Sequence, residues 1–210
     1  MSDLKTITET LISGDGDTLM VQVKEALDQG IPAGEILSEG LIAGMDIVGE
    51  RMETGEMFIP EVLMSAQAMG EAVEILKPLL AEGETSTAGR VVIGTVKGDL
   101  HDIGKNLVVM MMESAGFEVT DLGVDVDADA FMKAIEELNP HIVGLSALLT
   151  TTMPAMRDTV SKIAEAGKKD AVKIMVGGAP VNQAFADEIG ADAYASDAGS
   201  ACKLAKAMLK

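Results

Sequence analysis

The chain of 210 residues carries a formal net charge of −18, and 48% of its residues are hydrophobic although only 2% are aromatic. This length fits one large domain or two small ones, and the acidity disfavours nucleic acid and anionic membranes as partners. One cysteine excludes an internal disulfide, and two histidines are too few for a multi-histidine zinc site. Since no segment is apolar enough to cross a bilayer and the first residues lack a signal-peptide pattern, we expect a cytoplasmic protein.

Residues 1–80 show helical patterns only. Asp17 is expected to cap the second helix, and Pro60 stands where the first turn of a helix tolerates proline. Several glycines interrupt the third helical pattern. Four helices with short connections predict an up-down bundle. The predicted helices span Leu4–Ile12, the segment from Asp17 to about Gln29, Ala33 to about Thr54, and the segment from Pro60 to about Leu80.

Residues 81–90 (AEGETSTAGR) are small, polar and glycine-containing, which predicts an exposed linker between domains at 1–80 and 91–210. From Val91 onward a strand followed by a helix repeats five times, a pattern typical of an α/β domain with a parallel sheet covered on both faces. Five strands favour the flavodoxin-like (Rossmann-like) order 2-1-3-4-5. The predicted strands are Val91–Val96, Phe117–Leu122, His141–Leu148, Val172–Val176 and Ala193–Tyr194; the helices lie near Ile103–Ala115, Ala128–Leu138, Pro154–Ala166, Gln183–Ile189 and Ser200–Leu209.

The first strand, Val91–Val96, leads through the breaker Lys97–Asp99 into a helical pattern. The polar bridge between them lies outside the carboxyl end of a parallel strand, where α/β proteins bind their ligands. In the spacing Asp-x-His-x-x-Gly, His101 could bind a metal through one ring nitrogen while the other donates to Asp99. Gly104 leaves the start of the helix bare for a bulky ligand. The same residues would also suit a structural loop with a helix-capping aspartate.

Two other loops are expected at the same edge of the sheet. The order 2-1-3-4-5 brings the loop Gly98–Gly104 next to Ser146–Met153, which is rich in small hydroxyl residues. These hydroxyls could bind a ligand or cap the helix that starts near Pro154. Gly177 and Gly178, after the fourth strand, could admit a flat ligand to the backbone or form a tight turn.

The run GDLHDIGKN, from Gly98 to Asn106, resembles the cobalamin-binding signature of B12-dependent methyl-transfer proteins. That group includes the corrinoid carrier proteins of methylamine-type methyltransferase systems and the matching module of cobalamin-dependent methionine synthase. The resemblance extends to a Ser-x-Leu element at Ser146–Leu148 and to the segment GERMETGEMFIPEVL at 49–63. It therefore covers the chain from about Ala33 to Ala198.

The resemblance implies that cobalamin or a related corrinoid binds with its own lower base displaced and with His101 as the cobalt ligand. Asp99 would orient the ring of His101, and Thr152, where relatives have serine, would complete a ligand–acid–hydroxyl chain. The displaced nucleotide tail would enter the sheet domain. The cofactor-binding residues implied for this domain are Gly98, Asp99, His101, Asp102, Ile103, Gly104, Ser146, Leu148, Thr150, Thr152, Gly177, Gly178 and Ala198.

By the same resemblance, the helical domain would be a cap over the upper face of the corrin. Because such a cap must move aside for each partner enzyme, we hypothesise that the linker is its hinge. Met52, Ile59, Val62 and Leu63 would face the cobalt-bound methyl group, and Glu39 is a further candidate contact. The cobalt would alternate between Co(I) and methyl-Co(III) as the methyl group passes from a substrate-specific methyltransferase to an acceptor methyltransferase. A reductive activating protein could be a third partner. The chain would then be a carrier subunit and not itself an enzyme.

Other classes of protein share parts of this pattern. A receiver-type signalling domain has the same topology, but it needs a lysine at the end of the fifth strand, and Tyr194–Ala198 contains none. The B12-binding subunit of a mutase or a B12-dependent sensor would also use His101; the mutase needs a catalytic barrel, and the sensor usually carries a DNA-binding domain. A hydrolase with a metal on Asp99, His101 and Asp102 would need further ligands.

Overall fold

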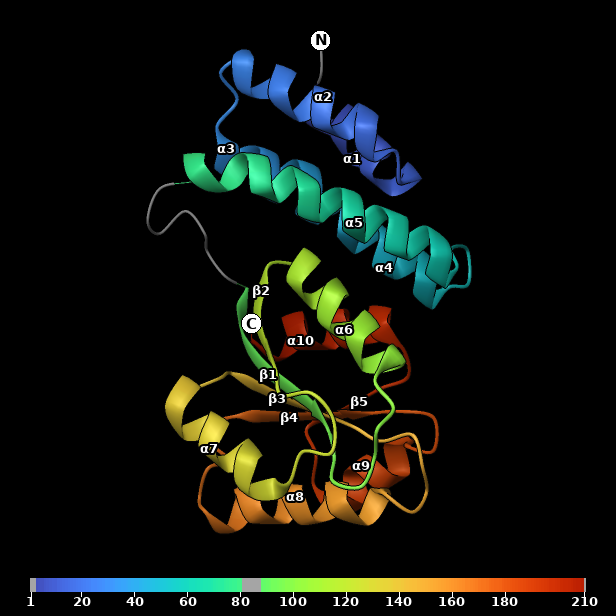
Figure 1. Ribbon diagram of the computed structural model, residues 1–210, viewed down its shortest axis with the longest axis vertical. Coiled ribbons are helices and arrows are strands. Elements are labelled where there is room, and N and C mark those ends of the chain that lie inside the picture. Colours follow the sequence, from blue (N-terminus) through green and yellow to red (C-terminus); the bar gives the residue numbers. More distant parts are fainter. Residues whose placement is uncertain (1–2, 81–87, 210) are drawn as a thin grey trace. The chain divides into compact units, whose positions relative to one another are not determined.

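Figure 1 shows the computed structural model, which describes residues 3–80 and 88–209. These residues fall into two compact units, one made of helices and one built on a sheet. Most of the predicted linker at 81–90 lies outside the described residues, so its role as a hinge and the exact domain limits stay predictions.

The helical unit contains the four helical stretches expected from the sequence. The fourth and longest of them, α5 (Ile59–Leu76), packs against α2 (Gly16–Asp28) and α4 (Ala43–Glu53). The third stretch is continuous, but its middle part has the wider π-type turn. None of the described helices is long and apolar enough to span a membrane. The elements are α1 (Leu4–Ser13), α2 (Gly16–Asp28), α3 (Ala33–Glu35), the π-helix η1 (Ile36–Ile42), α4 (Ala43–Glu53), α5 (Ile59–Leu76) and the short 3₁₀ helix η2 (Lys77–Leu79).

The cap of the second helix lies two residues earlier than predicted. The prediction that Asp17 caps it is wrong, because the carboxylate of Asp15 accepts the backbone N–H of Thr18 at 3.1 Å and Asp17 lies inside the first turn. Both aspartates suit a cap by residue type, so the sequence alone does not separate them. Pro60 lies in the first turn of α5, as predicted.

The sequence pattern suggests that glycines interrupt the third helical stretch, but the stretch is continuous. These glycines instead let another helix approach closely. A Cβ on Gly44 would lie 2.8 Å from Cδ2 of Leu11, and a Cβ on Gly40 would lie 3.1 Å from Cγ2 of Ile7. Leu11 and Ile7 belong to α1 and are fully buried. The glycines therefore belong to the packing of α1 against this stretch.

The sheet unit has five parallel strands in the order β2-β1-β3-β4-β5, which confirms the predicted topology. Helices α6 and α10 cover one face, and α7, α8 and α9 cover the other (Figure 1). The elements are β1 (Gly89–Thr95), α6 (Ile103–Ser114), β2 (Phe117–Asp121), α7 (Ala128–Leu138), β3 (Ile142–Ser146), α8 (Met153–Glu165), β4 (Lys173–Gly177), α9 (Gln183–Ile189), β5 (Ala193–Ala195) and α10 (Ala198–Met208).

The strands have almost entirely apolar sequences because their side chains are buried, on one face in the core beneath α7, α8 and α9. Phe131 of α7 is fully buried and packs with Val92 of β1 and Val143 of β3. A Cβ on Gly94 would lie 2.9 Å from Cζ of Phe131, so the aromatic ring lies close against the backbone of β1. Because helices cover both faces of the sheet, few positions in its central strands can be polar.

Replacing Phe131 by Ala should lower the free energy of unfolding by about 3–5 kcal/mol, because it empties a fully buried aromatic site. Lys133→Ala, on the same helix with a side chain that is 73% exposed, should change it by less than about 0.5 kcal/mol. Urea denaturation followed by circular dichroism measures both losses. Equal losses in the two variants would contradict this account of the core.

Candidate functional site

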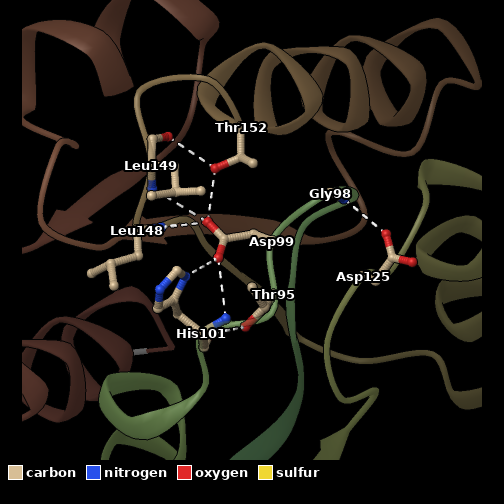
Figure 2. Close-up of polar contacts among 8 residues, drawn as sticks. All are labelled: Thr95, Gly98, Asp99, His101, Asp125, Leu148, Leu149 and Thr152. Carbon is tan, nitrogen blue, oxygen red and sulfur yellow. Dashed lines mark hydrogen bonds and ion pairs between the residues drawn. The ribbon is translucent and has the colours of Figure 1, made fainter.

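The polar loop after β1 meets the loop after β3 at the carboxyl edge of the sheet. The backbone N–H of Val96 donates to the carbonyl of Ser146 at 3.0 Å and so joins the ends of the two strands. Beyond this bond, Asp99 and His101 face Leu148, Leu149 and Thr152 (Figure 2). The motif therefore lies at the point where the strand order changes direction, as the predicted topology requires.

The carboxylate of Asp99 is fully buried and holds the two loops together. Its Oδ1 accepts the backbone N–H of His101 at 3.1 Å and lies 2.7 Å from His101 Nδ1. Its Oδ2 accepts the backbone N–H groups of Leu148 at 2.7 Å and Leu149 at 3.3 Å. The hydroxyl of Thr152 donates to the same oxygen at 2.8 Å (Figure 2). Both carboxylate oxygens are thus occupied by donors from the protein.

These donors keep Asp99 charged. Burial by itself raises the pKa of a carboxyl group, but the hydrogen bonds from His101, Leu148 and Thr152 stabilise the charged form more strongly. Together they hold the pKa of Asp99 well below its usual range. A carboxylate can only accept hydrogen bonds, so His101 Nδ1 must be the donor in the contact between the two side chains. In the neutral imidazole, the lone pair available to a metal is therefore on Nε2.

His101 combines this fixed tautomer with access to a ligand. Its side chain is 51% exposed, although the carboxylate that orients it is completely buried. Its carbonyl accepts the hydroxyl hydrogen of Thr95 at 2.9 Å, which fixes the backbone of the loop as well. An exposed imidazole held in one orientation by a buried acid is the arrangement that protein metal ligands commonly have.

Thr152 forms the predicted chain of contacts with Asp99 and His101. Its Oγ1 lies 2.8 Å from Asp99 Oδ2 and 2.9 Å from the carbonyl oxygen of Leu149. A hydroxyl has one hydrogen, and the charged carboxylate is the stronger acceptor. Although Thr152 immediately precedes α8, its side chain makes no capping hydrogen bond, so the simpler helix-cap interpretation does not account for this hydroxyl.

The glycine pair after β4 brings two backbones together. Gly178 has a φ of 120°, and a Cβ there would lie 1.9 Å from the carbonyl oxygen of Ala147, which no side chain could accommodate. A Cβ on Gly177 would lie 3.0 Å from the carbonyl oxygen of Ala195. Close packing of neighbouring loops thus accounts for both glycines, and their contact with a ligand stays a prediction.

The other predicted contact residues of the sheet unit differ in accessibility. Ile103 is 86% exposed, Leu148 is 43% exposed, and a Cβ on Gly104 would meet no atom within 4 Å. Ala198, in contrast, is buried at the start of α10. Those with intermediate or high exposure also include Asp102, Ser146 and Thr150.

The predicted contact residues of the helical unit lie on α4 and α5. Ile59 is 52% exposed and Leu63 is 39% exposed, whereas Val62 is fully buried. Met52 has intermediate exposure. Ile59 and Leu63 are thus more accessible candidates than Val62, and the contact of all four with a ligand stays a prediction.

The sequence carries no direct signal for two donors to this cluster. The N–H groups of Leu148 and Leu149 belong to the backbone, so no residue type marks them as donors to Asp99. The predicted proximity of the two loops is the one indication in the sequence that backbone N–H groups would reach the carboxylate of Asp99.

The described residues do not form a metal site made of several side chains. Among residues 3–80 and 88–209, no three His, Cys, Asp or Glu side chains are placed to hold a metal ion together. Oδ2 of Asp99 already accepts hydrogen bonds from the neighbouring loop, and Oδ1 already accepts from His101. The hydrolase alternative, with a metal on Asp99, His101 and Asp102, is therefore not supported by the described geometry.

Comparison with known proteins gives matches over nearly the whole chain. A family model described as a B12 binding domain matches residues 89–203, and a second model with the same description matches residues 4–77. The dimethylamine corrinoid protein 1 of Methanosarcina acetivorans is 45% identical over 207 residues, which cover 98% of this chain and 97% of that protein.

Two solved structures are also similar. A cobalamin-binding protein from Desulfitobacterium hafniense DCB-2 has a TM-score of 0.85 and 33% identity, with 99% of each chain covered. A chain of the methanol:cobalamin methyltransferase complex MtaBC from Methanosarcina barkeri has a TM-score of 0.81 and 33% identity, covering 97% of this chain and 78% of that one.

Replacing Asp99 by Asn should destabilise the protein by about 2 kcal/mol at pH 7, because a charged acceptor of several buried hydrogen bonds is lost. The pKa of Asp99 is lowered by folding, so its contribution to stability is complete above the unfolded pKa of about 4 and is lost as the pH falls below it. The difference between wild type and variant should therefore shrink between pH 7 and pH 3.

Urea denaturation of both proteins at the two pH values measures this difference. Asp102→Asn removes a carboxylate from the same loop without removing the hydrogen bonds of Asp99, and it serves as the control. If the difference in unfolding free energy between wild type and Asp99→Asn stayed constant with pH, the charge of the carboxylate would not be the source of its contribution to stability.

Proposed function

Because this chain belongs to the family of B12-binding corrinoid proteins of methyltransferase systems, we propose that it carries a methyl group on a corrinoid held by His101. The corrinoid would bind with its own lower base displaced, in the base-off, His-on form. A substrate-specific methyltransferase and an acceptor methyltransferase would be its partners, and a reductive activating protein would restore the cofactor. We further propose a cytoplasmic location, which the single cysteine favours.

The observation that carries this proposal is the pairing of His101 with Asp99. Nδ1 of the imidazole lies 2.7 Å from a buried carboxylate, and the side chain is nevertheless half exposed. One ring nitrogen is thus committed to the protein, and the other is left for a ligand that reaches the carboxyl edge of the sheet.

The surroundings of His101 also suit a large, flat and mostly apolar ring. Leu100 is 71% exposed and Ile103 is 86% exposed, so two apolar side chains flank the imidazole in sequence without being buried by the protein. Leu148, from the loop after β3, adds a third that is 43% exposed. A ligand that covered these side chains would gain hydrophobic stabilisation, and Gly104 leaves room beside them.

These contacts indicate which role the protein has and which role the cofactor has. When bound, the cobalt of the corrinoid supplies the chemistry, taking up and releasing the methyl group as it alternates between Co(I) and Co(III). Asp99 fixes the tautomer of His101 and makes Nε2 a stronger electron donor. Thr152 and the amides of the β3 loop keep Asp99 charged.

The alternatives of a mutase subunit or a B12-dependent sensor have less support. The similarity to a dimethylamine corrinoid protein covers 98% of this chain, and the second B12-binding model matches the helical residues 4–77. These matches favour a methyl carrier that works beside separate methyltransferases. The chain itself would then have no methyltransferase activity without its partners.

The proposed cobalt ligand is tested best by comparing the two histidines of the chain. After loading with hydroxocobalamin and reduction to Co(II), the electron paramagnetic resonance spectrum of the wild-type protein should show hyperfine coupling between the unpaired electron of Co(II) and one nitrogen nucleus. That coupling should change when the protein contains isotopically labelled histidine. His101→Ala should lose the histidine coupling. His141→Ala should keep it, because Nδ1 of His141 accepts the backbone N–H of Arg90 at the opposite end of the strands.

Two outcomes would overturn the assignment. Coupling that persists in His101→Ala and still responds to labelled histidine would identify another ligand. Coupling in the wild-type protein that ignores the histidine label would mean that the lower base of the cofactor remains bound to cobalt.

Thr152→Val should weaken the binding of hydroxocobalamin by about tenfold, because it removes a hydroxyl that supports the acid behind the ligand while keeping a similar shape. Thr152→Ser should restore most of the affinity. Absorbance titration at pH 7 measures both variants. Equal affinities for Thr152→Val and Thr152→Ser would show that the hydroxyl has no part in holding His101.

A further inference from the structure

The turn after β2, residues 122–126, is fixed to the end of β1 beside residues 96–102, the loop that carries Asp99 and His101 and that we call the cofactor loop. The backbone N–H of Leu122 donates to Ile93 at 2.8 Å, that of Thr95 donates to Gly123 at 3.0 Å, and that of Val126 donates to Thr95 at 2.9 Å. Backbone hydrogen bonds on both sides of the turn leave it little freedom relative to β1. It is therefore a firm support for any side chain that it carries.

Asp125 extends from this turn to the residues that precede His101. Its carboxylate Oδ1 accepts the backbone N–H of Gly98 at 2.8 Å (Figure 2), and Nζ of Lys97 lies 3.4 Å from the same oxygen. Its own backbone N–H donates to the carbonyl of Asp99 at 3.0 Å. One residue thus contacts three successive positions of the cofactor loop.

The conformation of Asp125 suits this task. Its φ is 55°, a left-handed value that most side chains avoid and that aspartate and asparagine tolerate best. The hydrogen bond from Gly98, helped by the charge of Lys97, lowers the pKa of the Asp125 carboxyl group, so the acceptor is charged at neutral pH. Gly98 also has a left-handed φ, of 82°, so the loop turns sharply where Asp125 holds it.

The end of β2, just before this turn, makes a further contact with the chain on the other side of His101. Lys105, in the first turn of α6, forms an ion pair with Asp121, the last residue of β2. The side chain of Lys105 is 1% exposed, so its ammonium group is shielded from water, whereas the side chain of Asp121 is 33% exposed. Asp121 also accepts the backbone N–H of Gly123 at 2.8 Å. The β2 segment therefore contacts the loop before His101 and the first turn of α6 after it.

From this arrangement we infer that Asp125 is a positioning residue for the cofactor ligand. Its carboxylate fixes the backbone at Gly98, and its own backbone N–H holds the carbonyl of Asp99. Together these contacts fix the direction in which His101 presents Nε2. This inference rests on the proposed role of His101 as the cobalt ligand. A residue that only stabilised its own turn would affect folding but not the ligand.

Three variants separate these two roles. Asp125→Gly keeps the left-handed backbone accessible and removes the carboxylate, whereas Asp125→Asn keeps both the conformation and an acceptor oxygen. Asn139→Gly is the matched control, since Asn139 is the other non-glycine residue with positive φ in residues 3–80 and 88–209, with φ 46° at the end of α7.

The first readout is made on the chain without cofactor. Hydrogen exchange of the Gly98 amide should be about tenfold faster, or more, in Asp125→Gly than in wild type, because that amide loses its acceptor. Asp125→Asn should retain most of the protection, and Asn139→Gly should leave this amide unchanged. Unchanged exchange in Asp125→Gly would overturn the inference, because the carboxylate would not be holding the loop.

The second readout uses hydroxocobalamin. Asp125→Gly should bind it about tenfold more weakly than wild type and with a smaller fraction in the His-on form, while Asp125→Asn and Asn139→Gly stay within about twofold. The thermal midpoint of Asp125→Gly should lie below that of Asn139→Gly, because the carboxylate that accepts the hydrogen bond from Gly98 is lost. A lower midpoint for Asp125→Gly with unchanged affinity would make Asp125 a structural residue of the turn and overturn the inference.

The two proposals fail in different ways. If wild-type protein never shows histidine coupling to cobalt, the proposed ligand is wrong, and the inference built on it is overturned as well. If wild-type protein shows that coupling and Asp125→Gly shows it to the same extent and with the same affinity, only the positioning role of Asp125 is wrong.

Discussion

The hydrogen bond between His101 and the buried carboxylate of Asp99 is the interaction on which the site depends. It requires an acid that stays charged without contact with water, and that is costly unless the protein supplies donors. The donors come from the loop after β3, which reaches Asp99 only because β1 and β3 are adjacent in the sheet. The strand order therefore determines the electrostatics of the imidazole as well as its position.

Much of this arrangement can be predicted from the sequence, because it follows from patterns that repeat along the chain. Alternating strands and helices predict the order of the parallel sheet, and that order brings the loops carrying Asp99 and Thr152 together. The motif spacing around His101 then predicts which side chains meet. The helical content of residues 3–80 follows in the same way from periodicity and from the positions of proline and glycine.

Other features depend on partners that no local pattern reveals. Asp15 rather than Asp17 caps α2, although both residues suit that position. Gly44 permits the approach of Leu11, whose position depends on how two helices pack and not on the sequence near the glycine. Asp125 contacts the cofactor loop because a turn after β2 adopts a left-handed conformation there, and the aspartate alone does not predict that conformation. Tertiary contacts decide each of these cases.

Thr152 has a single hydroxyl hydrogen and two acceptors, Asp99 Oδ2 and the carbonyl oxygen of Leu149, at nearly equal distances. Rotation about one carbon–oxygen bond transfers that hydrogen from one acceptor to the other while every heavier atom keeps its place. Such a rotation changes how many hydrogen bonds Asp99 Oδ2 accepts without any movement of the backbone. The hydrogen bonding of a buried carboxylate can thus differ within one fixed arrangement of heavy atoms.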